Sequence, residues 1–553
     1  MWLEILINVP LATAGIWTSV VFSSNISIRL SLNQVNELAL TVVLLAVLGY
    51  LGFLFSWLEY VLNSNQLMNG FRIFLLVSAL VMIFQNRPSE QSIRLVILST
   101  LTTFVAVTTA LCRGIADKNQ GIQHTLAVRY WVSIDNSIPG IFAHALQNKQ
   151  PLRPEILAGW QGSDRPPIAT GLVRVFSPLT HTLSPDFFII CSSSSVLIFA
   201  VVALTRVIWE RRGLSFAIGI SMATYFCPGI FINVVYTWPK IIAASLTLVA
   251  VAVLCQSGVR DKNGISKIYL TTFAITLALL THGSSIFVVP ILLILLVFNS
   301  TMAKKHFTLA SLLSVIIYLP WFLYQQYWDP PGNRLLFWHL AGQLEGGKGG
   351  ILSGIWENYK QLSFGQVVQN KLWNVQSLLF QSEGNPGVAG YSGLLRPYRQ
   401  LFSESVVGAI GILGWLGLIA FFLFGLRDIN KARRIVIASI CMSALTFCVV
   451  EYGESFSTRA SLHISPMMIS IGLAVLAFGA LIEHCGVGAK LVIVLSLANV
   501  VLLGPLQPTA AAIGWGLEIW DFGTIALLAI SVTVLFRYAF MLINLESNLL
   551  DEG

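Results

Sequence analysis

Long apolar stretches recur along the chain and constrain its fold more than any other feature. A helix needs about 20 apolar residues to cross a hydrocarbon core of about 30 Å. We therefore predict about 14 transmembrane helices. The number can differ by one or two, because window methods merge or split neighbouring stretches. The longer stretches lie near 37–58, 93–112, 187–208, 213–235, 240–257, 307–325, 405–426, 464–484, 488–504 and 521–543, and the shorter ones at 5–23, 70–85, 268–282, 284–300 and 434–450.

The composition excludes a water-soluble fold. Of the 553 residues 56% are hydrophobic and only 10% are charged, whereas soluble domains carry roughly 25% charged residues. The net charge of +8 does not indicate a nucleic-acid reader, because the Lys and Arg residues are scattered between apolar stretches instead of gathered in one patch.

The Lys and Arg residues of the short connections predict the orientation of the chain. Cytoplasmic loops carry an excess of these residues. When the predicted spans alternate, most of the basic connections fall on one side, which we assign to the cytoplasm. The basic residues on that side are Arg87, Arg94, Arg206, Arg211, Arg212, Arg260, Lys262, Lys267, Lys304, Lys305, Arg427, Lys431, Arg433, Arg434 and Lys490. The long loops 113–186 and 326–404 then face outward.

No repeat of fixed period and no Pro-, Gly- or Ser-rich linker divides the chain. We expect an N-terminal membrane module at 1–85, a membrane core at 86–325 that includes the outer loop 113–186, a large outer loop at 326–404, and C-terminal transmembrane helices at 405–553. Within 136–147, apolar residues at helical spacing predict an amphipathic helix that lies in the membrane interface.

Several familiar chemistries have no signature here. The seven cysteines lack metal-ligand spacing, so we expect neither disulfides nor a thiolate metal centre. The sequence has no phosphate-binding Gly-x-x-x-x-Gly-Lys loop and no His-Glu-x-x-His zinc motif. These observations argue against an ATP-driven pump.

The segment 129–172 carries the most informative polar residues. Asp135 follows a predicted span, and Asp164 and Arg165 stand directly before Pro166 and Pro167. The two prolines favour an extended backbone and so fix the direction of the preceding side chains. A carboxylate can take a proton from an attacking hydroxyl, and Arg matches phosphate oxygens. The alternative is that Asp135 caps a helix and that Asp164 pairs with Arg165 in a solvated turn.

This segment resembles the first outer loop of GT-C membrane glycosyltransferases, particularly protein O-mannosyltransferases and lipid A aminoarabinose transferases. In that loop an acidic residue after a span precedes a Lys-Pro-Pro-Leu-like or His-Pro-Pro-Leu-like motif. Asp135 occupies the acidic position, with Asn136 where the family often has a second acid, and Asp164-Arg165-Pro166-Pro167-Ile168 is the later motif. The resemblance implies that Asp135 is the general base and that Asp164 and Arg165 shape the donor pocket.

Tyr236, Trp238 and Lys240 form a second candidate cluster in a short outer connection. Lys240 is close enough to the membrane to meet a lipid phosphate, but Trp and Tyr beside a snorkelling Lys are also typical of an interfacial belt. His282 stands at a break between apolar stretches. A polar residue near membrane depth is a functional candidate, and a hydrogen-bonded His in a tight hairpin is the structural alternative.

Two further candidate groups lie in later outer loops. Arg459 and His463 precede a span, where the resembled family has an Arg that helps to hold the donor phosphate; a charged anchor at the water boundary is the alternative. Asp329 and Arg334 open the loop 326–404, which is longer than a connector requires and so favours a lid or an acceptor surface.

The resemblance implies an all-α polytopic membrane protein, a GT-C-like bundle of about 14 transmembrane helices whose two large extracytoplasmic loops carry amphipathic helices. It implies an enzyme of a bacterial plasma membrane, with the active site facing the periplasm or exterior. This enzyme would transfer a sugar from a polyprenyl-phosphate donor, held by Arg165, Lys240 and Arg459, to an extracytoplasmic glycan, lipid or protein.

Asn136, where the family often has a second acid, argues against a metal site, and we assign no metal ligands. A divalent cation stays open as a cofactor. Two alternative functions also stay open. The first is a polysaccharide polymerase or O-antigen ligase-like enzyme, which would depend on Arg and His of the outer loops. The second is a lipid-linked glycan transporter or flippase, which needs no catalytic acid.

Overall fold

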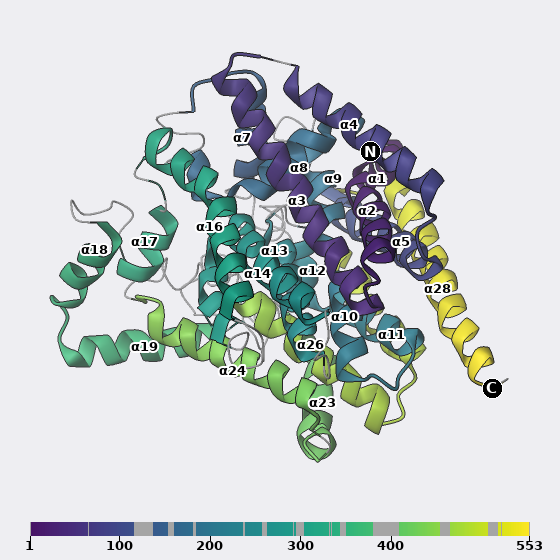
Figure 1. Ribbon diagram of the computed structural model, residues 1–553. Helices are drawn as coiled ribbons and strands as arrows, with labels where there is room; N and C mark the ends of the chain where they lie inside the picture. Colours follow the sequence, from purple (N-terminus) through teal and green to yellow (C-terminus); the bar gives the residue numbers. More distant parts are fainter. Residues whose placement is uncertain are drawn as a thin grey trace.

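The computed structural model is an all-α assembly of closely packed helices (Figure 1). One ribbon of two three-residue strands pairs Arg113 with Trp520. The structure describes residues 2–64, 66–115, 137–152, 160–180, 184–235, 238–256, 263–290, 292–294, 304–330, 332, 334–342, 350–379, 409–427, 429–453, 465–506, 518–520 and 522–551.

The helices and strands of the described residues can be given in chain order. In order they are α1 (Trp2–Ala12), α2 (Ala14–Leu30), α3 (Gln34–Val61), α4 (Leu67–Gln85), α5 (Glu90–Leu111), β1 (Arg113–Ile115), α7 (Ile138–Gln147), η3 (Gly162–Asp164), α8 (Pro167–Phe176), η4 (Ser177–Leu179), α9 (Pro185–Ser194), α10 (Leu197–Ile208), α11 (Leu214–Tyr225), α12 (Pro228–Val235), α13 (Lys240–Cys255), α14 (Asn263–Thr281), η5 (Gly283–Phe287), α16 (Lys304–Tyr327), α17 (Arg334–Ala341), α18 (Gly350–Tyr359), α19 (Phe364–Leu379), α23 (Gly411–Ala420), η6 (Phe421–Gly425), α24 (Lys431–Val450), α26 (Ser465–His484), α27 (Ala489–Leu506), β2 (Glu518–Trp520) and α28 (Phe522–Asp551).

Eight helices of the described residues are long and apolar enough to cross a membrane, or up to nine if one bent pair is a single span. Five shorter apolar helices accompany them. The chain is therefore a multi-pass membrane protein. One predicted span, 213–235, differs from a straight helix, because α11 and α12 meet at 74°. The bend lies directly before Pro228, whose ring cannot continue a regular helix.

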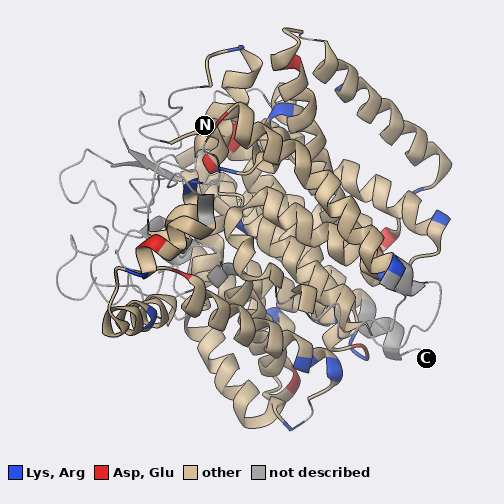
Figure 2. Cartoon of the chain, turned by 60° about the vertical axis from the view of Figure 1, so that its left-hand side comes forward, with Lys and Arg blue, Asp and Glu red and all other residues tan. Residues whose placement is uncertain are grey.

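The helix ends gather at two opposite ends of the molecule. At one end Asn33 Nδ2 donates to Gln256 Oε1 at 2.8 Å, and Asn430 Nδ2 donates to the carbonyl of Ile208 at 2.9 Å. Cys255 Sγ donates to the Ala432 carbonyl. Because Cys255 is next to Gln256 and Ala432 is close to Asn430, this bond places both contacts at the same end. The residues Arg29, Arg206, Lys267, Lys431 and Arg433 belong to this basic end. Figure 2 shows that the long middle parts of the helices carry few charges.

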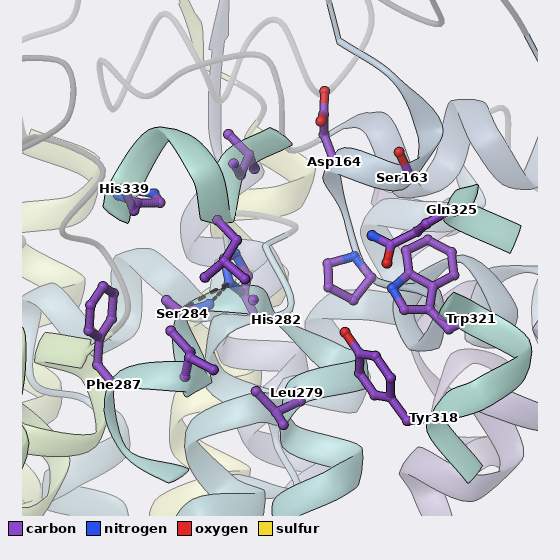
Figure 3. A pocket seen from close by; sticks show the side chains of 15 residues that line it. Ser163, Asp164, Leu279, His282, Ser284, Phe287, Tyr318, Trp321, Gln325 and His339 are labelled. Carbon is purple, nitrogen blue, oxygen red and sulfur yellow. Dashed lines mark hydrogen bonds between the residues drawn. The ribbon is translucent and has the colours of Figure 1, made fainter. Parts of the chain in front are cut away.

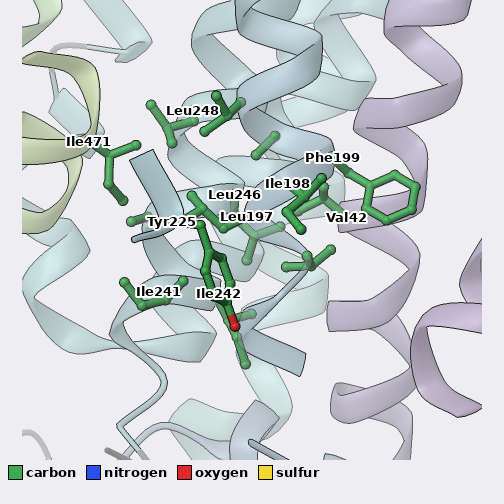
Figure 4. Packing of buried hydrophobic residues seen from close by; sticks show 14 of the residues in the cluster. Val42, Leu197, Ile198, Phe199, Tyr225, Ile241, Ile242, Leu246, Leu248 and Ile471 are labelled. Atoms are coloured by element: carbon green, nitrogen blue, oxygen red, sulfur yellow. The ribbon is translucent and has the colours of Figure 1, made fainter. Parts of the chain in front are cut away.

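Helix α3 lies at the centre of the packing, against α8, α10, α13 and α14. Figure 4 shows the apolar layer that it shares, in which Val42 of α3 lies near Phe199 of α10. Its contact with α8 is exceptionally close, because Gly49 and Gly52 face Gly171. Small residues let helix backbones approach in membrane proteins. Helix α8 follows Pro166 directly, so this contact fixes the start of the first-loop motif in space.

A buried polar cluster holds α8 at the end opposite the basic end. Arg174 Nη2 lies 3.3 Å from Glu59 Oε2, and Arg174 Nε donates to Ser56 Oγ at 3.1 Å. Arg174 Nη1 donates to Gln147 Oε1 of α7 at 2.7 Å. The predicted amphipathic helix in 136–147 is therefore present as α7, and it packs against α8 with Phe142 buried.

The helices α17, α18 and α19 extend from the left of the assembly in Figure 1. Along α19 the exposed apolar side chains follow a stripe at helical spacing, Phe364, Val368, Leu372, Val375 and Leu379. Its buried side is polar and packs against α24, with Asn374 Nδ2 donating to the Glu451 carbonyl at 2.7 Å. This polarity is the reverse of a helix on a soluble protein.

Candidate functional site

A cavity of about 260 Å³ lies where the two outer loops meet the helix ends (Figure 3). Its walls come from four places: the segment before α8, the turn after α14, the last turns of α16, and α17. The lining residues are Ser163, Asp164, Pro166, Leu279, His282, Gly283, Ser284, Ile286, Phe287, Tyr318, Trp321, Gln325, Leu335, Leu336 and His339. Two of the residues predicted from sequence, Asp164 and His282, are therefore brought together in one cavity.

Local sequence fixes the position of Asp164. The residues Gly162–Asp164 form one 3-10 turn, and Asp164 Oδ2 accepts a hydrogen bond from the Gln161 amide at 2.8 Å. Arg165 is extended, as expected for a residue before proline, and Pro167 begins α8. The predicted stiff backbone is therefore present at Arg165 and Pro166, and it ends where α8 starts.

The opening of the second loop closes on this turn. Asp329 Oδ2 accepts a hydrogen bond from the Ser163 amide at 2.8 Å. Arg334 Nη1 forms an ion pair with Asp164 Oδ2 at 3.7 Å. Burial raises the pKa of Asp164 above its ordinary value, although the Gln161 hydrogen bond and the nearby Arg334 and Arg165 oppose the rise. The structure thus joins Asp164 and Arg165 to Asp329 and Arg334, a pair that lies far from the first in sequence.

Two buried cations lie within electrostatic reach of the cavity-lining His282. The guanidinium of Arg165 lies 5.1 Å from the ring centroid of Trp160. Lys240 begins α13 and is 1% exposed, with Nζ 3.0 Å from the ring centroid of Trp238. A cation is attracted to the face of an aromatic ring when both are removed from water. Trp238 is itself buried.

His282 connects the cations to the cavity. It directly follows α14 and is the N-cap of η5, and its Nδ1 accepts a long hydrogen bond of 3.4 Å from the Ser284 amide. Burial lowers the pKa of His282 well below its ordinary value, and the positive charges of Arg165, Lys240 and His339 lower it further. These three residues are therefore within electrostatic reach of a cavity-lining side chain, and the region favours a negatively charged group.

Several lining residues were missed from the sequence. Gln325 is a polar residue at the end of the apolar stretch 307–325. A polar side chain at the end of a span is the sequence signal that could have marked it as a candidate site residue. His339 lies in α17, and its Nδ1 is 3.1 Å from Oε1 of the fully buried Glu451. Burial also raises the pKa of Glu451. No local pattern predicts the His339–Glu451 pair, since its partners belong to different loops.

Four predicted site residues lie outside the described residues: Asp135, Tyr236, Arg459 and His463. Their roles stay predictions. Within the described part of the chain, no group of three or more His, Cys, Asp or Glu side chains could hold a metal ion.

Comparisons with known proteins find no matching family model and no matching curated protein. Among solved structures, the chain is similar to ArnT from Cupriavidus metallidurans bound to undecaprenyl phosphate. The identity is 15%, the alignment covers 83% of this chain and 72% of that chain, and the TM-score is 0.46.

Two more solved structures are similar to the chain. The apo state of the same ArnT matches at 14% identity over 67% of this chain and 78% of that chain, with a TM-score of 0.33. The archaeal oligosaccharyltransferase AglB from Archaeoglobus fulgidus, in complex with an inhibitory peptide and a dolichol-phosphate, matches at 15% identity over 81% of this chain and 55% of that chain, with a TM-score of 0.37.

Proposed function

We propose that the chain is a membrane glycosyltransferase of the GT-C type, which moves a sugar from a polyprenyl-phosphate donor to an acceptor outside the cytoplasm. One observation carries the proposal. A buried carboxylate, Asp164, lines a cavity beside two buried cations, Arg165 and Lys240. This combination suits a sugar-phosphate donor, because the cations attract its negative phosphate and the carboxylate can accept hydrogen bonds from its sugar hydroxyls.

The proposed orientation follows from the charges at the two ends. The cavity lies at the end opposite the basic helix ends described above, and basic loops favour the cytoplasm. The cavity then opens toward the exterior of a bacterial plasma membrane. A donor that is anchored by its lipid can reach it by lateral diffusion between the spans.

The proposed reaction is a displacement at the anomeric carbon. The acceptor oxygen forms a bond to that carbon, the bond from the carbon to the phosphate oxygen breaks with its electron pair, and the acceptor proton passes to Asp135. Arg165 and Lys240, with Arg459 as a third proposed cation, stabilise the charge on the departing polyprenyl phosphate. A single displacement of this kind inverts the configuration of the sugar.

The remaining candidates receive supporting roles in the proposal. Asp164 contacts the donor inside the cavity. Arg334 and Asp329 hold the second outer loop against the Gly162–Asp164 turn of the first. Tyr236, Trp238, His282 and His463 complete the proposed pocket. No step requires a metal ion.

Sugar transfer from a labelled polyprenyl-phosphate donor in isolated membranes tests the proposal. We expect Asp135→Asn and Arg165→Gln to reduce transfer at least about 100-fold, the usual effect of removing a catalytic base or a charge-stabilising group. Lys360→Gln is the matched control, because Lys360 is exposed at the end of α18. Full transfer by both site variants at normal protein levels would refute the assignment. Movement of the donor across sealed vesicles without transfer would instead favour a flippase.

A further inference from the structure

The cavity holds two buried hydrogen-bond acceptors that remain unsatisfied among the described residues. These atoms are Asp164 Oδ1 and Gln325 Oε1. Asp164 is 4% exposed and Gln325 is 2% exposed. The other Asp164 oxygen is already occupied by Gln161 and Arg334. A buried polar atom left without a partner costs about 1–3 kcal/mol. Such atoms in a cavity wall therefore point to a ligand that supplies donors.

The two acceptors lie on one side of the cavity, from different loops and helices. Figure 3 shows Asp164 and Gln325 with Trp321 next to Gln325. Trp321 is held rigidly, since its ring stacks on Tyr324 with centroids 5.2 Å apart. The opposite side combines the apolar side chains of Leu279 and Phe287 with His282, Ser284 and His339 (Figure 3). Hydroxyl donors on one edge and an apolar C–H face are the chemical features of a sugar ring.

The same atoms disfavour a phosphate at this position. A carboxylate oxygen and an amide oxygen both repel a negatively charged group. Arg165 and Lys240, whose positive charges act on the cavity-lining His282, attract such a group. A sugar phosphate therefore has one favourable direction. Its phosphate lies toward the two cations, and its sugar lies between Asp164 and Gln325.

The volume limits the size of the ligand. The cavity measures about 260 Å³, which is below the roughly 300–1,000 Å³ of pockets that enclose drug-sized ligands. A single sugar unit suits this space better than an oligosaccharide. We propose that Asp164, Gln325 and Trp321 form a subsite for one monosaccharide of the donor, bound through its hydroxyl donors. This inference rests on the proposed function and adds the size and the contacts of the sugar.

Binding measured with two kinds of lipid separates the subsite from the phosphate site. The probes are farnesyl phosphate and its conjugates with a neutral hexose, an N-acetylhexosamine, a pentose or a disaccharide, added to the full chain in nanodiscs. We expect at least one monosaccharide conjugate to bind more tightly than farnesyl phosphate, and the disaccharide conjugate to bind no more tightly than farnesyl phosphate.

Gln325→Met keeps the side-chain length and removes the acceptor. We expect it to weaken the preferred monosaccharide conjugate about 5- to 10-fold, the effect of one hydrogen bond, and to leave farnesyl phosphate within about 2-fold. Asp164→Asn is the second variant, which keeps the shape of the side chain. Arg165→Gln is the contrasting variant and weakens both kinds of lipid, while Lys360→Gln changes neither.

Two results would overturn the subsite and leave the proposed function standing. One is that no monosaccharide conjugate binds more tightly than farnesyl phosphate. The other is that Gln325→Met and Asp164→Asn, both folded by their thermal transition, bind every conjugate as the wild type does. Failure of all the lipids to bind the wild type would instead remove the proposed function, and the subsite with it.

Discussion

Replacing Gly171 by Ala tests whether the close contact of α3 and α8 sets the position of the site. A Cβ at Gly171 would lie 1.7 Å from the Gly49 carbonyl oxygen and 2.5 Å from the Phe53 amide nitrogen. Both neighbours are backbone atoms of α3, so no side chain can rotate away. An ordinary contact begins at 3.4 Å, and the helices must therefore separate by about the difference, 1.7 Å.

The expected cost follows from that displacement. Inserting a methyl group into a closely packed contact costs about 1–3 kcal/mol. The shift also moves the start of α8 at Pro167, two residues after Arg165. A misplacement of about 1 Å can cost about 100-fold in a rate. We therefore expect a lower thermal transition, and binding of farnesyl phosphate at least about 10-fold weaker than in the wild type.

Gly70→Ala is the matched control for this variant. Gly70 lies in the interior of α4, and nothing lies within 4 Å of a Cβ built there. Because Ala favours the helix more than Gly, the control is expected to be neutral or about 0.4–1 kcal/mol more stable. Thermal unfolding followed by tryptophan fluorescence compares the two variants in one detergent. Equal transitions and equal lipid affinities for Gly171→Ala and Gly70→Ala would refute the reasoning.

Three further outcomes are expected. Glu59→Ala leaves Arg174 buried without its ion-pair partner and should lower stability by about 3–5 kcal/mol in thermal unfolding; an unchanged transition would contradict it. Burial raises the pKa of Glu451 above 4.5, so wild-type stability should fall as pH rises from about 4.5 through the raised pKa. The Glu451→Gln variant should lack that fall. Thermal transition temperatures that change with pH in the same way in the wild type and in Glu451→Gln would contradict this prediction. A fluorophore at Leu372→Cys, in the exposed apolar stripe of α19, should be quenched by brominated lipids more strongly than one at Gln366→Cys; equal quenching would show that the stripe does not face acyl chains.

The sequence predicted the helices well where apolar length alone decides the structure. The stretches 37–58 and 93–112 are the cores of α3 and α5, whose polar capping residues Asn33 and Ser89 extend them outward. The bend between α11 and α12 was not predicted, because the apolar run continues through it. Hydropathy reports how apolar a segment is and carries little information on its direction in space.

The site was predictable only in part. Asp164 and Arg165 were indicated by their place before two prolines, and His282 by its place at a break. Their meeting with Gln325 and Arg334 depends on tertiary packing across more than 100 residues, as the contact of Ser163 with Asp329 illustrates. Such contacts have no local periodicity. The role of Asp135, outside the described residues, rests on the resemblance alone.

The position of a bound lipid phosphate tests the central claim most directly. We predict that an electron cryo-microscopy map of the full chain in nanodiscs with polyprenyl phosphate shows the phosphate within hydrogen-bond distance of Arg165 and Lys240, beside the cavity lined by Asp164. Phosphate density at the opposite, basic end of the molecule, with the Asp164 cavity filled by acyl chains, would contradict the account.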